Sequence, residues 1–282
     1  MTHCSGNGHS TYKSAGVDID LATDLLKRLK PKFAAAKRPE MLAPIGGFGG
    51  LFQIDLAKWK NPVMVASIDG VGTKLMVAAM MHKYDTVGHD IVNHCVNDIS
   101  VQGAEPVYFL DYIGIGKLRS PLYEEVVGGI ADACKEVGCA LLGGETAEMP
   151  GMYGEDFDLV GVITGMVEKD RIITGEKIRP GHVAIALPSN GLHTNGFSLA
   201  RRVLFTMRRY EVSSRLKELN GETIGEICNK FFAAREGVKT EDRQRIMRFI
   251  ENLCLGAAAV GYRTESMHGA GSPQAPRIMI AR

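Results

Sequence analysis

The pattern of apolar and polar positions along the first 170 residues predicts helices and short strands in mixed order. Apolar residues at helical spacing predict a helix from Asp18 to about Lys30, which we expect Pro31 to break. Short apolar runs bounded by glycine, proline or acidic residues predict strands at 62–68, 107–112, 139–142 and 159–167. Helical periodicity returns at 73–82, 89–102 and 123–137. This mixture indicates an α/β or α+β fold, a mixed sheet backed by helices.

A boundary between two domains is expected at about residues 168–175, where the last of these strands ends. We expect a flexible N-terminal arm, an N-terminal domain and a C-terminal domain, at 1–17, 18–170 and 171–282. The second domain opens with a predicted strand at 182–187 and a predicted helix at 198–207. Beyond about Gly225 the character of the sequence changes: it becomes charged, and then rich in glycine, serine and proline without clear periodicity.

Composition and charge exclude several classes of protein. The 282 residues include 33 Lys+Arg and 32 Asp+Glu, a net charge of +1, which does not draw the chain to nucleic acid or an anionic membrane. No apolar stretch approaches the roughly 18 residues that span a bilayer. The N-terminus also lacks the pattern of a secretory signal. We therefore expect a cytoplasmic protein whose six cysteines are reduced thiols.

Glycine is in excess, with 33 residues where composition averages give roughly 20. The run Ile45–Gly50 contains Gly46, Gly47 and Gly49 around Phe48, with a further glycine at its end. Such a run can turn sharply and present backbone N–H groups to an anion. A flexible surface loop explains the same run equally well.

The segment Ser67–Lys74 combines a strand end, glycines and the start of a helix. Asp69 ends the apolar strand, Gly70 follows it, and Thr73 and Lys74 open the next helix. Ligands gather at strand ends, and a helix N-terminus favours phosphate, so Asp69 would hold Mg²⁺ while Lys74 neutralises phosphate oxygens. Read alone, Asp69 is equally well a turn or cap residue, and Lys74 a solvated charge.

Two further acids repeat this arrangement. Asp98 lies within an apolar helical run, where a carboxylate is costly unless it is paired or bound to a metal. Glu145 follows two glycines at the end of a predicted strand. With Asp69 they form the set of oxygen ligands that a phosphate-bound Mg²⁺ requires.

A polar segment at 188–198 follows the expected boundary. It contains Ser189, His193 and Asn195 and leads into a helix at Ser198. These side chains are suited to a second phosphate or a sugar. A polar turn with Ser198 as the N-cap is the alternative, since a lone loop histidine is usually not catalytic.

Together these motifs resemble the phosphoribosylformylglycinamidine cyclo-ligase family, also called aminoimidazole ribonucleotide synthetases. The likeness runs in order from about Tyr12 to Gly225 through the segments 12–18, 46–52, 69–74, 98–106, 143–153 and 189–198. It implies ATP-dependent ring closure of formylglycinamidine ribonucleotide to aminoimidazole ribonucleotide in purine biosynthesis, through an iminophosphate. It also implies a cytoplasmic homodimer of two-domain subunits, whose N-terminal domains pair their sheets and bind ATP in the groove between them.

The resemblance also implies roles for individual residues. The nucleotide-binding residues that it implies are Lys27, Gly46, Gly47, Phe48, Gly49, Asp69, Gly70, Thr73, Asp98 and Glu145. The implied Mg²⁺ ligands are Asp69, Asp98 and Glu145. The substrate ribonucleotide would be bound by Ser189, His193 and Asn195, and the catalytic residues would be Lys74 and His193. A lysine late in an amphipathic helix is usually just solvated, which is the alternative for Lys27.

The chain departs from this family after about Gly225, so we expect its second α/β domain to be shortened and incomplete beyond that point. The family's glycine-rich His-x-Thr-Gly-Gly-Gly segment and its later Met-Tyr-Arg-Thr-Phe-Asn stretch are both absent from the sequence. A frameshift, an altered gene model and true divergence all give this pattern. A catalytically impaired module that binds nucleotide and dimerises is therefore an alternative function.

Sister enzymes of the same superfamily are a further alternative: selenophosphate synthetase, thiamine-phosphate kinase or a hydrogenase-maturation factor. Selenophosphate synthetase needs a cysteine or selenocysteine with a nearby lysine, and Cys4 precedes Lys13 here. The segments 12–18 and 144–153 nevertheless fit the cyclo-ligase better.

Overall fold

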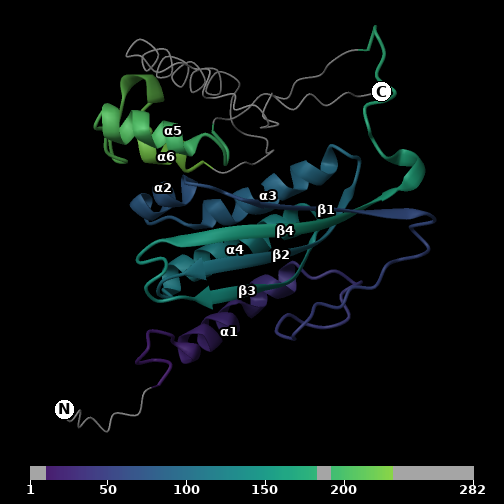
Figure 1. Ribbon diagram of the computed structural model, residues 1–282, viewed down its shortest axis with the longest axis horizontal. Helices are drawn as coiled ribbons and strands as arrows, with labels where there is room; N and C mark the ends of the chain where they lie inside the picture. The colour runs from purple at the N-terminus through teal and green to yellow at the C-terminus, as the bar shows by residue number, and fades with distance from the viewer. Residues whose placement is uncertain (1–10, 183–191, 231–282) are drawn as a thin grey trace, which may run out of the picture.

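The computed structural model describes residues 11–182 and 192–230, and these form a sheet with helices on one side (Figure 1). The first ten residues of the expected arm lie outside the described residues, as do the expected strand from residue 183 on and the tail beyond residue 230. Among the described residues, no helix is long and apolar enough to cross a membrane.

Four strands build one mixed sheet in the order β1-β4-β2-β3. They are β1 (Pro62–Gly70), β2 (Glu105–Ile115), β3 (Ala140–Glu148) and β4 (Phe157–Glu168). β4 pairs antiparallel with β1 and with β2, whereas β2 and β3 run parallel. The expected fold class is confirmed. The four strands expected before residue 170 are present and longer than expected, and β3 begins one residue later than expected.

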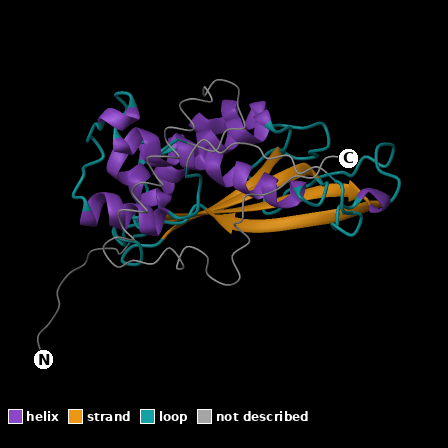
Figure 2. Ribbon diagram, turned by 90° about the horizontal axis from the view of Figure 1, so that it is seen from above, coloured by secondary structure: helices purple, strands orange, loops and turns teal. Residues whose placement is uncertain are grey.

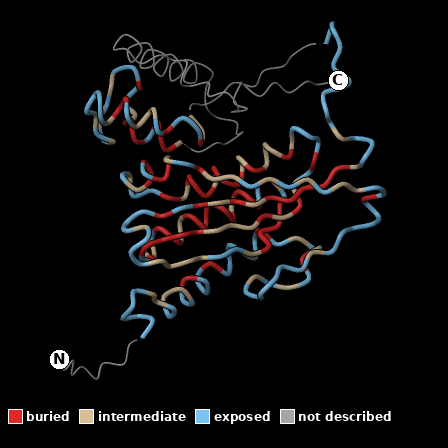
Figure 3. The backbone as a smooth tube through the Cα atoms, viewed as in Figure 1, coloured by how far each residue is buried: buried red, intermediate tan, exposed pale blue. Residues whose placement is uncertain are grey.

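Three helices follow the expected periodicity: α2 (Lys74–Met81), α3 (Asp85–Ser100) and α4 (Ser120–Glu136). α3 and α4 cover one face of the sheet, and none of the helices in the described part of the chain covers the other face (Figure 2). The two helices approach closely at Gly129. A Cβ atom added at this position would lie only 2.1 Å from the backbone oxygen of Asp85. Their side chains and the sheet enclose the main core, drawn in red in Figure 3.

Helix α1 (Ile19–Ala35) packs on α4, and it corrects one expectation. The helix passes through Pro31 and continues for another turn, so the expected break at this proline is wrong. Phe33, beyond the proline, packs against the main core. Burying this aromatic ring offsets the missing hydrogen bond of the proline.

The C-terminal described segment packs onto α2 at the end of the sheet where β1 finishes (Figure 1). It holds α5 (Phe197–Arg201), a π-helical turn at 202–207, a 3₁₀ turn at 217–219 and α6 (Ile224–Cys228). The expected helix at 198–207 is thus present, with a π-helical second half. A small separate cluster holds it to α2: Val77, Phe197, Leu204, Leu219, Ile224, Ile227 and Cys228. The cysteines that the structure describes are free and buried, as expected: Cys95, Cys134, Cys139 and Cys228.

Candidate functional site

Strand β1 and helix α3 bring four polar side chains together. Ser67 and Asp69 are two residues apart on the strand face that α3 covers, and His94 and Asp98 are four apart on the helix. Ser67 Oγ donates a hydrogen bond of 2.8 Å to Asp98 Oδ2, and His94 Nε2 contacts Asp69 Oδ2. One ligand atom from each of Asp69, His94 and Asp98 lies within 4.8 Å of the other two, a spacing that suits a metal ion.

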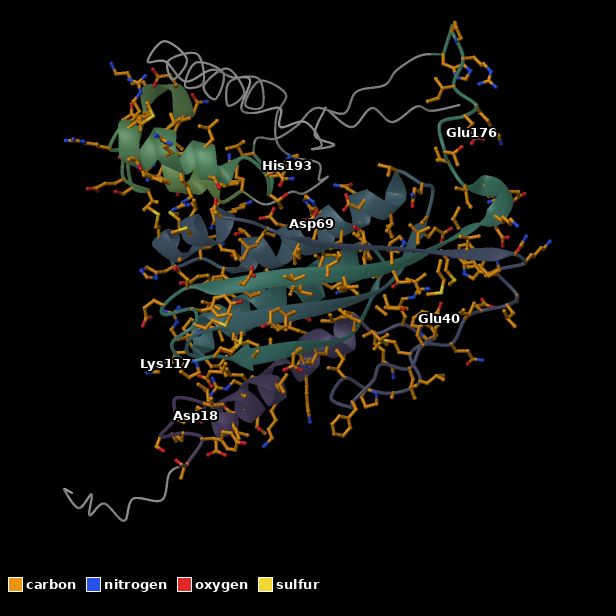
Figure 4. All side chains as sticks on the ribbon, viewed as in Figure 1. Asp18, Glu40, Asp69, Lys117, Glu176 and His193 are labelled. Atoms are coloured by element: carbon orange, nitrogen blue, oxygen red, sulfur yellow. The ribbon has the colours of Figure 1, made fainter. Side chains whose placement is uncertain are left out.

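The polar segment from residue 192 onward reaches this cluster. Thr194 Oγ1 forms a hydrogen bond with His94 Nδ1, and the Thr194 side chain is buried. Ser198 Oγ lies 3.2 Å from Thr73 Oγ1, at the start of α2. Figure 4 shows His193 beside the β1 edge near Asp69. Residues from the two expected domains therefore meet at one place.

His193 is uncharged at neutral pH in this arrangement. Burial, with smaller electrostatic contributions from Lys74 and His94, lowers the pKa of its imidazole to about 4. A neutral imidazole can donate or accept a hydrogen bond but does not attract a phosphate by charge. Its expected roles in catalysis and substrate binding stay predictions, as does that of the exposed Asn195. Ser189 lies outside the described residues.

Lys74 points into the protein interior rather than toward the acid cluster. Its ammonium forms a fully buried ion pair of 2.5 Å with Asp90 and donates a hydrogen bond of 2.7 Å to the backbone oxygen of Lys230. It also lies 5.6 Å from the ring centre of Phe197. Burial lowers the pKa of Lys74, and the Asp90 charge opposes this shift. The catalytic role expected for Lys74 stays a prediction, and this arrangement gives the side chain a packing role.

Glu145 lies at the opposite edge of the sheet from Asp69. The strand pairings trace a path across the sheet from Glu145 to the neighbour of Asp69. Glu145 is opposite Tyr112 of β2, Tyr112 is opposite Val160 of β4, and Val160 is opposite Gly70 of β1. Three strand spacings put Glu145 about 14 Å from the end of β1. One chain therefore does not bring Glu145 into the Asp69 cluster.

The glycine loop lies with Glu145 at the β3 edge. A Cβ on Gly50 would come within 2.3 Å of the Leu142 side chain, so the end of the loop packs closely on β3. Phe48 at its centre is fully exposed. Lys27 is exposed on α1, one residue after Leu26, which helps to line the cavity beside β3. The expected nucleotide residues thus form two groups, at opposite edges of the sheet.

That cavity has a volume of about 240 Å³ and lies between α1, α4 and β3. Ile45, Tyr123, Thr146 and Glu145 line it together with Asp111, a carboxyl on β2 that sequence reasoning did not single out. Burial raises the pKa of Asp111 to about 7. The carboxyl is therefore partly protonated at neutral pH.

We expect Asp111 to make the protein less stable as the pH rises from about 4 to about 7. In this window the folded state binds more protons than the unfolded chain at this group, so the free energy of unfolding falls with pH. Asp111→Asn should make this decrease in the free energy of unfolding smaller by on the order of 2–4 kcal/mol. Urea unfolding at several pH values measures it, and equal slopes for both proteins would contradict the expectation.

His94 is the site residue that sequence reasoning missed. The signal was present in the spacing of Asp90, His94 and Asp98, which follow each other at four-residue intervals in one helix. Such a spacing places three side chains in a row along one helix face. Asp90 pairs with Lys74, and the other two join the cluster with Asp69.

Comparison with known proteins adds sequence relatives. The AIR synthase related protein N-terminal domain matches residues 54–167, and the 4-hydroxyphenylacetate 3-hydroxylase C-terminal family matches residues 213–282. A phosphoribosylformylglycinamidine cyclo-ligase from Anaeromyxobacter sp. (strain Fw109-5) is 51% identical over 77% of this chain and 62% of its own length. One from Syntrophotalea carbinolica is 54% identical over 74% of this chain and 60% of its own length.

The chain spans about three fifths of the length of these curated relatives. Among solved structures, thiamine-monophosphate kinase from Stenotrophomonas maltophilia K279a is similar at a TM-score of 0.47 and 17% identity. The likeness covers 68% of this chain and 55% of that one.

Proposed function

Since about three quarters of this chain is homologous to phosphoribosylformylglycinamidine cyclo-ligases, we propose that it closes the imidazole ring of aminoimidazole ribonucleotide in purine biosynthesis. The substrate is formylglycinamidine ribonucleotide, ATP activates its amide oxygen as an iminophosphate, and the enzyme works as a cytoplasmic homodimer. The observation that carries the proposal is the close grouping of Asp69, His94 and Asp98 where β1 meets α3, within the matched domain.

The residues present suit a phosphate-bound Mg²⁺ ion. Asp69 and Asp98 offer carboxylate oxygens from two elements, and Ser67 holds one of these oxygens in place. Mg²⁺ prefers such oxygen ligands, and it would neutralise charge on the transferring phosphoryl group when bound. The turn at Gly70 and Thr73 then lies next to the phosphates. Glu145 of the same chain is too distant to complete this site.

A homodimer is part of the proposal because the sheet face opposite α3 and α4 is apolar. Ile68 lies in one row with Val162 and Leu110, and Met64 pairs with Met166 on the same face. The side chains of Ile68 and Met64 are 68% and 58% exposed. An apolar patch of this kind on a sheet marks an interaction surface.

Pairing of two such faces would also join the two groups of nucleotide residues. Within one chain the glycine loop and Glu145 lie across the sheet from Asp69. In a dimer we propose that they face the Asp69 end of the other subunit across the shared groove. ATP would then be bound by both subunits, with the loop at 46–49 and Lys27 on one side of it.

The proposal is tested by incubating the protein with Mg-ATP and formylglycinamidine ribonucleotide and measuring aminoimidazole ribonucleotide. Asp98→Asn keeps the shape of the side chain but removes its charge. A charge-assisted contact is worth about 2–3 kcal/mol, so we expect Mg-ATP to bind roughly 30- to 150-fold more weakly by calorimetry. Unchanged affinity would remove Asp98 from the site.

A second candidate is a module that binds nucleotide and dimerises without closing the ring. The match of residues 213–282 to a different family favours it, because the substrate groups would lie next to unrelated sequence. The same experiment separates the two candidates. The module binds Mg-ATP with the proposed dependence on Asp98 but yields no aminoimidazole ribonucleotide.

A further inference from the structure

The glycine loop is closed at its base, while its tip makes few contacts with the rest of the protein. The backbone N–H of Leu42 donates a hydrogen bond of 3.0 Å to the oxygen of Leu51, so the two ends of the loop lie side by side. At the tip, Phe48 is fully exposed. A Cβ atom added at Gly46 or Gly49 would meet no atom of the described residues within 4 Å. The direction of the tip is therefore determined by what holds the base.

The side chain of Arg38 joins the base of this loop to the sheet. Its guanidinium donates two hydrogen bonds to the carboxylate of Glu40, at 2.6 Å from Nη2 and 3.2 Å from Nε. Its Nη1 donates to the backbone oxygens of Gly138, just before β3, and Pro106, at the start of β2. The guanidinium carbon lies 5.6 Å from the centre of the Phe52 ring. One side chain thus contacts the residues before the loop, the residue after it and two strands.

These contacts are stronger than those of an ordinary surface ion pair. The side chains of Arg38 and Glu40 are each only 23% exposed, which limits screening by water. The hydrogen bonds from Arg38 hold the pKa of the Glu40 carboxyl below its usual value. A planar guanidinium that donates in several directions also fixes the geometry of its partners, which a lysine ammonium does not do. The Phe52 ring in turn packs on Tyr108 of β2, with 5.7 Å between the ring centres. The base of the loop is therefore held rigidly.

We propose that Arg38 is a positioning residue for nucleotide binding, which fixes the base of the glycine loop so that the backbone N–H groups of its tip face the phosphates of a nucleoside triphosphate. The inference rests on the proposed nucleotide role of the loop. Arg38 acts through Glu40 and Phe52 and does not itself contact the nucleotide. A loop that is already in its binding conformation does not have to be ordered by the ligand, so the affinity is higher without any further contact.

The test measures Mg-ATP binding by calorimetry and hydrogen exchange of the loop in the full chain. Arg38→Met keeps most of the side-chain length but removes the guanidinium. If the loop then spends about one tenth of the time in its binding conformation, Mg-ATP should bind about tenfold more weakly. The N–H groups of Leu42 and of Gln53, which donates to the Glu40 oxygen, should exchange faster. Saturating Mg-ATP should slow this exchange again, an effect that a purely structural role of Arg38 does not produce.

Two further variants show which property of Arg38 is needed. Arg38→Lys keeps the charge but loses the planar fork, so we expect a smaller loss of affinity in the same direction. Arg119→Met is the matched control, because Arg119 also joins a carboxylate and a backbone oxygen, both of Glu155. It lies beyond the other end of β2 from Pro106. This variant should bind Mg-ATP like the unaltered protein, with unchanged exchange in the loop.

Equal Mg-ATP affinity of Arg38→Met and the unaltered protein, or weaker binding without faster exchange in the loop, would overturn the proposal. If Arg38→Met does not fold, Arg38→Lys decides by the same two measurements. An unaltered chain that does not bind Mg-ATP would instead contradict the proposed nucleotide role of the loop, and this inference with it. Ring closure is not the readout, so a chain that shows these effects on Mg-ATP binding but forms no product would still support the role of Arg38.

Discussion

Replacing Asp90 with asparagine is expected to lower the free energy of unfolding by about 3–5 kcal/mol at pH 7. Asp90 and Lys74 are both fully buried, and their ion pair joins α3 to the start of α2. Without Asp90 the Lys74 ammonium would stay in the interior without a carboxylate beside it. The Lys230 backbone oxygen and the Phe197 ring remain near it. Chemical denaturation followed by circular dichroism measures the loss.

Two further variants show whether the loss of stability comes from a buried unpaired charge or merely from an altered contact. Lys74→Met combined with Asp90→Leu replaces the pair by apolar groups, and we expect much of the stability to return. Asp85→Asn is the matched control on the same helix, since Asp85 pairs with Lys83 at the surface. An exposed pair contributes about 0–1 kcal/mol, so its loss should be small. Equal effects of Asp85→Asn and Asp90→Asn would contradict the assignment of Lys74 as a buried cation.

The effect of Asp90→Asn should also depend on pH. Burial lowers the pKa of Lys74 in the folded state, and removing the opposing Asp90 charge lowers it further. Below its unfolded pKa the unfolded chain then binds more protons than the folded one, so stability rises with pH. The deficit of the variant should shrink as the pH approaches the ordinary pKa of lysine. A deficit that stays constant would mean that removing Asp90 leaves the protonation of Lys74 in the folded state unchanged.

The fold could be predicted from the sequence to a large extent because each element carries its own pattern. The four strands are apolar runs bounded by glycine, proline or acids, and the helices show clear periodicity. The helix does not end at Pro31 as expected, because local propensity is overridden when residues beyond the proline, here Phe33, pack on the core. The order of strands in the sheet was not predicted, since β4 lies between β1 and β2 and no local signal encodes that placement.

The candidate site could be predicted only in part, for a similar reason. Asp69 and Asp98 were identified from their local context, and the structure does bring them together. Lys74 stands in the same motif as Asp69, but its long side chain turns inward to Asp90, a contact that local sequence does not reveal. Glu145 also follows glycines at a strand, but the strand order places it on β3, at the edge of the sheet opposite β1. The local motifs therefore identified candidate ligand residues, but the order of the strands determined which of these residues lie close together.

Ile68→Glu is expected to convert a dimer into a monomer and to abolish ATP-dependent ring closure. Ile68 is 68% exposed on the sheet face that no described helix covers, so the substitution should leave the folding of one subunit nearly unchanged. In the proposed dimer the same position would be buried against the other sheet. An unpaired carboxylate there costs several kcal/mol, which raises the dimer dissociation constant by a factor on the order of 1,000.

Sedimentation velocity at micromolar concentration measures the change, with Ile173→Glu as the control. Ile173 is 57% exposed in the segment after β4, where its backbone N–H donates to the Gln102 oxygen just after α3, so the same substitution should leave the dimer intact. Loss of activity should follow loss of the dimer, because Glu145 and the glycine loop can reach an Asp69 cluster only across two chains. A dimeric Ile68→Glu protein would show that the subunits meet elsewhere. A monomeric variant that still closes the ring would show that a single chain assembles the ATP site by itself.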